Sequence, residues 1–477
     1  MTPEDFRIAG HQLIDWIADF RATIDDFPVA SNVSPGDIRA MLPVHPPAAT
    51  VGIEAMLHEL DRVILPGMMH AQHPRYFGFF PANSTLSAVL GDLASTGLGA
   101  LGLSWQSNPA LTEVEEAMCD WMRQLVGLSD AWLGTIQDTA STACLVSLLT
   151  ARERASNNSQ LTGGMQGHNR PLTVYCTGQA HSSVQKAALL AGFGLNNLRQ
   201  VAVDPLTFDM DPASLRALLL ADIETGRRPT AIVASVGATA CTAFDPVSAI
   251  VEIAREFDCF VHVDAAMAGT AMMLPEMRHL WDGVEGADAV TWNPHKWMGT
   301  SLDCSLYYVR DQLQLNSVMS TNPSYLSSVH DGMVTQYRDW GIPLGRRFRS
   351  LKLWFQLMLD GVASIQERVR RDLANAQWLT AQVDNAPGWV RVAPTRLQTV
   401  CIRHEPADAV GAVLDDHTRA WAAAVNATGR CYLTPSLLDS QWMVRVSIGA
   451  EATTIEHVQD AWTLIQESAQ RAAQARR

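Results

Sequence analysis

Lys296 and Asp264 are the two charged residues whose positions in the sequence suggest chemistry. Lys296 lies in "NPHKW", directly after the strand-like run "AVTWN", and Asp264 ends the apolar run in "CFVHVDAA". Ligands of α/β sheets bind at the carboxyl ends of strands. A carboxylate there needs a cationic or donor partner, because burying an unpaired charge is costly. Two interpretations follow: a cofactor site built on an amine and an acid, or a buried structural Asp–Lys pair.

Two further strand ends carry polar groups. In "GTIQDTASTACLVSLLTARERA" a strand-like start runs into a helical pattern, with Thr139, Ser141 and Thr142 at the junction. Hydroxyls and free amides at a helix start suit a bound phosphate, and they equally form an ordinary N-cap. His181, in "QAHSSVQKAALLAG", follows the strand-like "LTVYCT". Taken alone, it is explained by a structural role.

Together the four strand ends supply an amine, a carboxylate, a phosphate cup and an aromatic ring that can stack. Pyridoxal 5'-phosphate (PLP) requires this set: a lysine for the Schiff base, an acid that keeps the pyridine nitrogen protonated, and a phosphate anchor. Their joint occurrence, rather than any single element, predicts a PLP site.

The elements that must position these residues predict an α/β fold. Between about residues 130 and 310, the apolar runs "LTVYCT", "TAIVASVGA", "CFVHVDAA", "AVTWN" and "SLYYVR" alternate with helical segments. Strands that are apolar throughout and separated by helices indicate a mainly parallel sheet covered on both faces. We expect three parts: a helical lobe at residues 1–85, a large α/β domain at 86–365 and a small α+β domain at 366–477.

The composition argues against several other classes of protein. With 477 residues, 47% hydrophobic and 18% charged, the chain has the composition of an ordinary folded protein. The net charge of −14 disfavours nucleic acid as a partner, and no apolar run approaches the length that spans a bilayer. Eight scattered cysteines without a CxxC pair predict buried free thiols and no metal site. We expect a cytoplasmic protein that acts on small molecules.

The stretch "GLGALG", Gly97 to Gly102, matches the dinucleotide motif GxGxxG in its letters only. That motif needs a strand before it and a helix after it. Here "LSAVLGDLAST" before it has helical spacing, and "LSWQSNPA" after it is a loop. We interpret it as close backbone packing at small residues. GxSxG, HExxH and GxxxxGK[ST] do not occur.

Over nearly its whole length the sequence resembles the group II PLP-dependent decarboxylases, and within them the aromatic L-amino acid decarboxylases. The resemblance is carried by "VSPGDIRAMLP", "ILPGMMHAQHPRYFGFFPANS", "SWQSNPALTEVE", "QAHSSVQKA", "HVDAAMAG", "NPHKWMGTSLDCS" and "QYRDWGIPLGRRFRSLKLWF". It implies a fold-type I PLP-dependent transferase fold, with a mostly parallel seven-stranded sheet flanked by helices. It also implies a homodimer with active sites at the interface and the N-terminal lobe packed over the partner.

The resemblance implies a role for each matched residue. Lys296 looks like the Schiff-base lysine, Asp264 like the partner of the pyridine nitrogen and His181 like the imidazole stacked on the ring. The other matched cofactor positions are Thr139, Ala140 and Ser141 of the phosphate loop, Thr239, Ala266 on the opposite ring face, Asn293 and His295. Leu344 and Gly345 match a segment that reaches the phosphate of the neighbouring subunit.

Tyr337, in "VTQYRDW", matches the mobile-loop tyrosine that in this family protonates the substrate carbon after carbon dioxide leaves. In the related aldehyde synthases a phenylalanine replaces that tyrosine. Its retention favours decarboxylation to an arylalkylamine over the alternatives on the same fold, an aldehyde synthase or an aminotransferase. On this basis Tyr337→Phe is expected to lose most amine production and to gain aldehyde.

Positions that line the substrate pocket in the family correspond to Ala71, Phe79, Phe80, Pro81, Ala82, Leu101 and Leu103. This wall is apolar and shows no evident cation, which disfavours an acidic substrate. Animal relatives tend to have a tryptophan, a hydroxyl and an aromatic residue at Ala71, Ala82 and Leu103, so these departures leave room for an indole. Among plant members, glycine at Gly345 goes with indolic substrates. We therefore expect L-tryptophan as the preferred substrate and tryptamine as the product, with DOPA, tyrosine and phenylalanine as further candidates.

Overall fold

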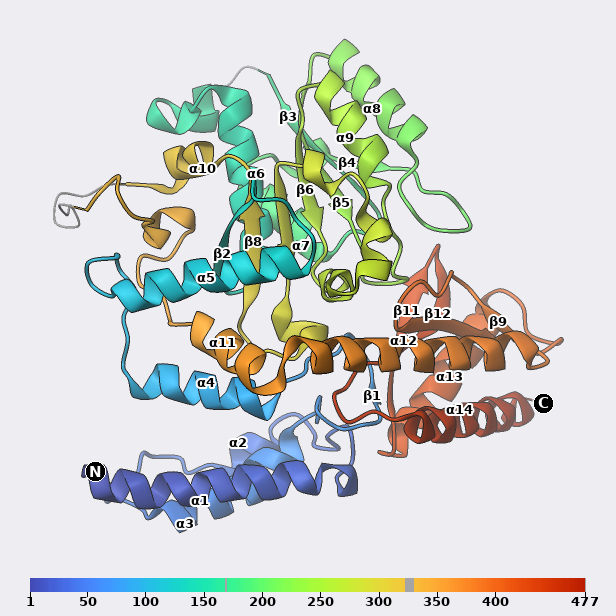
Figure 1. The fold of residues 1–477 in the computed structure, drawn as a ribbon. Coiled ribbons are helices and arrows are strands. Elements are labelled where there is room, and N and C mark those ends of the chain that lie inside the picture. The colour runs from blue at the N-terminus through green and yellow to red at the C-terminus, as the bar shows by residue number, and fades with distance from the viewer. Residues whose placement is uncertain (168–169, 322–329, 477) are drawn as a thin grey trace.

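The centre of the molecule is a seven-stranded sheet, seen in a computed structural model that describes residues 1–167, 170–321 and 330–476 (Figure 1). Its strands are β2 (Leu133–Gln137), β3 (Leu172–Thr177), β4 (Leu198–Val201), β5 (Arg228–Ser235), β6 (Phe260–Asp264), β7 (Ala289–Trp292) and β8 (Ser305–Val309). The strand order is β2-β8-β7-β6-β5-β3-β4, and β8 runs antiparallel to both β2 and β7. The neighbouring pairs from β7 to β4 are parallel. This confirms the expected mostly parallel sheet.

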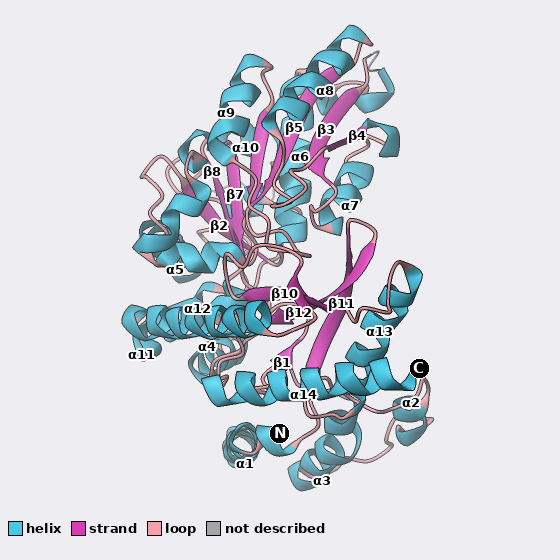
Figure 2. Cartoon of the chain, turned by 90° about the vertical axis from the view of Figure 1, so that its right-hand side faces the viewer, coloured by secondary structure: helices cyan, strands magenta, loops and turns pink. Residues whose placement is uncertain are grey.

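Helices cover both faces of this sheet (Figure 2). One face carries α6 (Ala140–Ser156), α7 (Ser182–Leu190) and α10 (Gln312–Met319), and the other carries α8 (Pro212–Glu224) and α9 (Val247–Glu256). Alternate residues of β5 enter different cores: Ala231 and Val233 pack with α6, whereas Ile232 and Ala234 pack with α9. Successive side chains of a strand point to opposite faces, so burial on both faces requires an apolar strand throughout.

A second, five-stranded sheet lies in the C-terminal part of the chain. Its strands are β1 (Tyr76–Phe77), β9 (Trp389–Arg391), β10 (Thr399–His404), β11 (Tyr432–Leu438) and β12 (Gln441–Ser447), in the order β1-β11-β12-β10-β9. The helices α12 (Val362–Asn385), α13 (Ala412–Ala427) and α14 (Ile455–Ala475) share a core with it. β1 pairs in parallel with β11. The N-terminal stretch, expected to be mainly helical, therefore also contributes a strand to the C-terminal sheet.

The N-terminal helices α1 (Pro3–Ala22), α2 (Asp37–Met41) and α3 (Ile53–Glu59) lie at the bottom of Figure 1. α1 begins at a capping box: the Thr2 hydroxyl accepts the Asp5 N–H at 3.1 Å, and the Asp5 carboxylate accepts the Thr2 N–H at 2.8 Å. No residue of α1 is buried. Above it, α4 (Leu86–Gly97) packs against α11 (Ser350–Asp360), and α5 (Pro109–Leu125) packs against β2.

The Gly97–Gly102 stretch does not have the context of a dinucleotide site. α4 ends at Gly97, and Gly102 exchanges backbone hydrogen bonds with Arg346, both at 3.0 Å. A Cβ on Gly102 would lie 2.9 Å from Leu111 Cδ1. Close backbone packing, the interpretation favoured by the sequence, therefore holds.

All eight cysteines are buried and unpaired, as expected of free thiols in the protein core. Across the part of the chain that the structure describes, no helix has the length and apolar character needed to cross a bilayer.

Candidate active site

The carboxyl ends of β2, β3, β6 and β7 meet at one edge of the large sheet, where a cavity opens. Its inner part is lined by ten of the residues expected to bind the cofactor: Thr139, Ala140, Ser141, His181, Thr239, Asp264, Ala266, Asn293, His295 and Lys296. An adjoining outer part shares Phe80, His181, Thr239, His295 and Lys296 with it. Phe79, Phe80, Pro81 and Ala82, called the aromatic wall below, line the outer part. The fold thus brings the expected amine, acid, imidazole and helix start to one place.

Lys296 follows β7 and carries its amine into this cavity. The Nζ atom lies 5.2 Å from the centre of the Phe80 ring. Burial lowers the pKa of the Lys296 amine, Asp264 opposes this shift, and the nearby Arg445 cation adds to it. A lowered pKa increases the fraction of neutral amine, which is the nucleophilic form that attacks a carbonyl carbon.

Asp264 ends β6, and its Oδ1 atom accepts the N–H of Ala266 at 3.0 Å. Two residues earlier on the strand, His262 is fully buried, and burial lowers its pKa to about 4. The His262 Nδ1 atom bonds to the Ser147 hydroxyl at 3.0 Å, and Ser147 donates to the Tyr307 hydroxyl at 2.9 Å. The groups behind Asp264 are therefore polar but neutral, so its negative charge remains available to the cavity.

The two cavity histidines are held in one tautomer by the backbone. The Nδ1 atom of His181 accepts the Ser183 N–H at 3.2 Å, and the Nδ1 atom of His295 accepts the Cys304 N–H at 2.9 Å. Burial lowers the pKa of both rings, to about 4 for His295. A neutral imidazole whose Nδ1 is an acceptor carries its proton on Nε2. Both rings therefore offer an N–H donor.

The start of α6 combines the two roles that its sequence left open. Thr139 is the N-cap, with its hydroxyl accepting the Thr142 N–H at 3.4 Å. Thr139, Ala140 and Ser141 also line the cavity. The first amides of a helix have no acceptor within the helix, and the positive end of its dipole favours an anion. An ordinary N-cap and a phosphate-binding helix start thus coexist here.

The residues of the inner cavity fit PLP. Asn293 lines it with a buried Oδ1 atom that has no hydrogen-bond partner among the described residues, so a bound group would have to supply one. Asp264 offers a carboxylate for the pyridine nitrogen, the α6 start offers amides for the phosphate, and Lys296 offers its amine for the aldehyde carbon.

Tyr337, the expected proton donor, lies outside this cavity. Its hydroxyl donates to the Gly134 carbonyl at 3.2 Å, and its ring packs under the Arg346 guanidinium, 4.9 Å away. Only 5% of the residue is exposed, and burial raises the pKa of its phenol well above the ordinary value. With the hydroxyl directed at a carbonyl of β2, the position of Tyr337 gives no support to a role in proton delivery. The role assigned to Tyr337 from the sequence therefore stays a prediction without support from the geometry of its own chain.

Five other expected residues also lie outside the cavity of their own chain. Leu344, Gly345 and Leu101 are exposed, and a Cβ on Gly345 would lie 3.8 Å from Leu101 Cδ1. Leu103 follows Gly102, which bonds to Arg346. Ala71 is next to Gln72, which does line the outer cavity. The sequence therefore named two groups of residues, one that lines the cavity and one that lies outside it.

Several residues of the outer cavity were not named from the sequence, and among the described ones Arg445 is the one that carries a charge. It is 3% exposed, and its guanidinium carbon lies 4.7 Å from the centre of the Phe80 ring. Its Nε and Nη2 atoms are buried and have no hydrogen-bond partner among the described residues. The pocket wall therefore does contain a cation. The available signal was an arginine inside the apolar run "QWMVRVSIG", where an unpaired charge requires a reason.

Comparison with known proteins agrees with this site. Residues 35–405 match the family model described as "Pyridoxal-dependent decarboxylase conserved domain". A phenylacetaldehyde synthase from Arabidopsis thaliana is 38% identical, covering 98% of this chain and 96% of that protein. Tyrosine decarboxylase 4 from Petroselinum crispum is 36% identical, covering 98% of this chain and 94% of that protein.

Among solved structures, Oryza sativa TDC with PLP and tryptamine superposes with a TM-score of 0.95 at 35% identity, covering 99% of both chains. The match spans both sheets and the N-terminal helices, so it confirms the fold-type I architecture. With a PLP-fitting cavity, a matching family model and full-length relatives, this chain belongs to the pyridoxal-dependent decarboxylase family and uses PLP.

Proposed function

We propose that this protein decarboxylates aromatic L-amino acids to arylalkylamines and carbon dioxide, with L-tryptophan as the preferred substrate. The observation that carries the proposal is the arrangement around Phe80: its ring contacts both the Lys296 amine and the Arg445 guanidinium. An amine for cofactor attachment, a cation for the substrate carboxylate and an aromatic surface therefore adjoin one another.

Bound PLP supplies the pyridine ring into which the electrons of the breaking carbon–carbon bond pass. Asp264 holds the proton on the pyridine nitrogen, which stabilises the negative charge where it develops. Arg445 receives the α-carboxylate through its two free donors, and the Nε2–H of His181 adds a neutral donor. The carboxylate is thereby held in one orientation, and orientation selects which bond breaks.

The outer cavity favours an aromatic side chain. The aromatic wall and Tyr76 present rings and an aliphatic surface to the space beside Lys296. Once Arg445 holds the α-carboxylate, a second carboxylate finds no further arginine among the described residues that line the outer cavity. Ala82 offers no hydroxyl to a phenol or catechol, which supports an indole, and the similar rice structure was solved with tryptamine.

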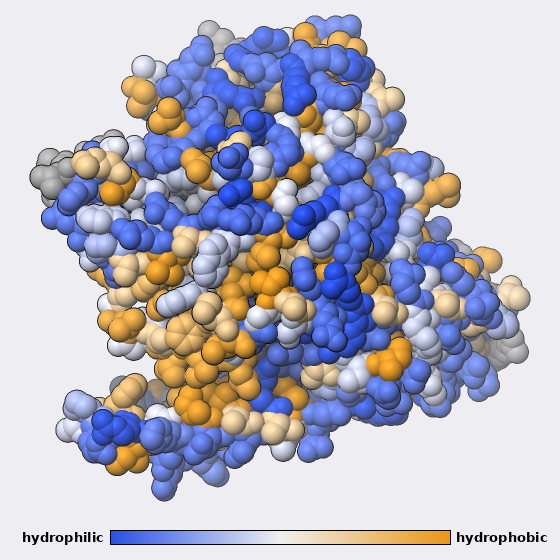
Figure 3. Space-filling view, in the orientation of Figure 1, coloured by the Kyte–Doolittle hydropathy of each residue, from blue (hydrophilic) through white to orange (hydrophobic). Residues whose placement is uncertain are grey.

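We further propose that the active protein is a homodimer. α4 exposes Leu86, Leu90 and Leu93, and α11 exposes Met358 and Leu359. Figure 3 shows a continuous apolar surface over this region, between α1 and α5. Exposed patches of this kind mark interaction sites. A second subunit on this face would bury it. Leu101, Leu103 and Gly345 of each chain would then complete the cavity of the other chain.

An aromatic aldehyde synthase is the second candidate function. The 38% identity to a phenylacetaldehyde synthase favours it. The two activities share cofactor, fold and carbon dioxide release, and they differ in whether the remaining carbon is protonated or oxidised. Product analysis separates them.

Initial rates of carbon dioxide release test the substrate assignment. The holoenzyme is supplied with tryptophan, tyrosine, DOPA, phenylalanine, histidine or glutamate in parallel. The proposal predicts the highest kcat/KM for tryptophan and turnover of glutamate near the blank. A higher kcat/KM for glutamate or histidine than for every aromatic substrate would contradict it. As a check on the cofactor site, Lys296→Ala should lose the absorbance of covalently held PLP.

A further inference from the structure

The aromatic wall starts from an uncommon backbone conformation. Phe79 has φ of 45°, in the left-handed region. Residues other than glycine seldom adopt this conformation and keep it only where the surroundings enforce it. The Phe79 side chain is 52% exposed, so burial of the ring does not explain why the conformation is kept. The cause must lie in specific contacts.

Thr434 on β11 supplies the main contact at this end of the wall. Its hydroxyl accepts the Phe79 N–H at 2.7 Å, and the Phe79 ring stacks on Tyr432 with centroids 6.0 Å apart. The preceding Gly78 lies so close that a Cβ there would be 2.3 Å from Tyr432 Cδ1. Thr434 is also the cross-strand partner of Arg445. The same strand pair therefore carries both this contact and the cavity guanidinium.

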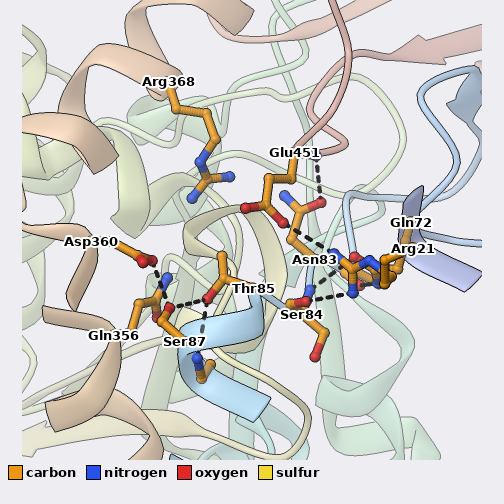
Figure 4. Close-up of polar contacts among 12 residues, drawn as sticks. Arg21, Gln72, Asn83, Ser84, Thr85, Ser87, Gln356, Asp360, Arg368 and Glu451 are labelled. Carbon is orange, nitrogen blue, oxygen red and sulfur yellow. Dashed lines mark hydrogen bonds and ion pairs between the residues drawn. The ribbon is translucent and has the colours of Figure 1, made fainter. Parts of the chain in front are cut away.

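Gln72 holds the other end of the wall, and Figure 4 shows it beside Ser84, which follows the wall by two residues. Its Nε2 atom donates to the Ala82 carbonyl at 2.7 Å, and its Oε1 atom accepts the Ser84 N–H at 3.0 Å. Just beyond, Asn83 donates to the Gly449 carbonyl at 2.6 Å, and Arg21 donates to the Ser84 carbonyl at 2.9 Å. The backbone after Ala82 is thus fixed to three separate parts of the chain.

We propose that Thr434 and Gln72 are positioning residues that determine which aromatic side chain the enzyme accepts. They hold the two ends of a four-residue wall, so the space beside Phe80 keeps one shape when the substrate ring enters. Discrimination between rings depends on such support, because a wall that yields by a fraction of an ångström fits several rings equally. This inference rests on the proposed function, which assigns the wall to the substrate ring.

The test replaces each contact by an isosteric group that lacks it. Thr434→Val removes the acceptor, and Gln72→Met removes both amide contacts. For each holoenzyme, kcat/KM is measured by carbon dioxide release with tryptophan, tyrosine and phenylalanine. We expect the ratio between the best and the worst ring to fall about fivefold or more, mainly through a higher KM for the best ring. PLP absorbance should be unchanged.

Two matched variants separate positioning from general stability. Thr434→Ser restores a hydroxyl and should return the ratio to within about twofold of the wild type, and Ser436→Ala on the same strand should leave it unchanged. In a Phe79→Gly background, where the left-handed conformation is unstrained, Thr434→Val should have a smaller effect. A proportional loss for all three rings, or an unchanged ratio in both isosteric variants, would overturn the proposal.

Failure of the proposed function would be visible separately. Carbon dioxide release is common to amine and aldehyde formation, so a wild-type enzyme that releases carbon dioxide without amine contradicts the proposed product and leaves the ring ratios measurable. If no aromatic substrate releases carbon dioxide, the ratio of the Kd values for tryptamine and tyramine on the holoenzyme replaces the kinetic ratio. Thr434→Val and Gln72→Met should then lower that ratio about fivefold or more.

Discussion

Arg445 is the residue whose removal should most directly affect substrate binding. Arg445→Met keeps the length and the apolar contact with Phe80 but loses the charge and the free donors. Loss of a charge-assisted pair of this kind should raise KM for the amino acid about 30-fold, and PLP absorbance should be retained. Arg391→Met, which removes an arginine paired with Asp384 on the same small sheet, is the matched control. A KM for Arg445→Met within twofold of the wild type would show that the carboxylate binds elsewhere.

Tyr337→Phe tests where the proton comes from. Because the Tyr337 hydroxyl donates to the Gly134 carbonyl, the variant should form amine at a rate within about twofold of the wild type and lose about 1 kcal/mol of stability. Amine, aldehyde and the urea midpoint are measured together. Tyr325→Phe is the comparison. Tyr325 is the other tyrosine between residues 320 and 340, and it lies outside the described residues. Loss of amine with gain of aldehyde in Tyr337→Phe alone would restore the role first inferred from the sequence.

The sequence predicted which residues meet in the inner cavity because each lies within a local motif at a strand end. Lys296, Asp264, His181 and the α6 start need only the order of strands to meet, and parallel strands place their carboxyl ends at one edge. Arg445 was missed because its role depends on β12 lying across the cavity from Phe80, a tertiary contact without a local pattern.

Other features could not be predicted from sequence for different physical reasons. β1 has two residues, too few to show the alternation that marks a strand. Family likeness at Tyr337 does not fix where a loop hydroxyl points, because loop positions depend on tertiary contacts such as the one to Gly134. The left-handed conformation of Phe79 likewise arises from β11, not from its own neighbours.

At the scale of elements, His262 links β6 to α6 and should make stability depend on pH. Its pKa is about 4 in the folded chain against an ordinary 6.5. Between these values the unfolded chain binds a proton that the folded chain does not, so stability is complete above pH 6.5 and falls towards pH 4, by at most about 3 kcal/mol. Urea midpoints across this range should depend less steeply on pH in His262→Gln. An unchanged dependence would contradict the assignment.

At the scale of the whole molecule, the apolar face over α4 predicts a dimer. Light scattering should give about twice the 52.1 kDa chain mass. The double variant Leu90→Glu with Leu93→Glu should be monomeric and inactive, because dimer formation would bury the two new charges without partners. A fully active monomer would contradict shared sites.

Mixed dimers give a sharper form of that prediction. Lys296→Ala lacks the amine of its own site, and Leu101→Asp disturbs the site of the neighbouring subunit. Each variant alone should be inactive, whereas co-expression should recover about a quarter of the wild-type activity, since half the dimers then contain one intact site. No recovery would place Leu101 at the site of its own chain.

The proposed activity is defined by the fate of the substrate carbon after carbon dioxide leaves. The most direct measurement is the stoichiometry of products from L-tryptophan and PLP-loaded enzyme in air. Decarboxylation predicts tryptamine and carbon dioxide in equal amounts, without hydrogen peroxide. Carbon dioxide accompanied by indole acetaldehyde and peroxide instead of tryptamine would contradict it and establish the aldehyde synthase.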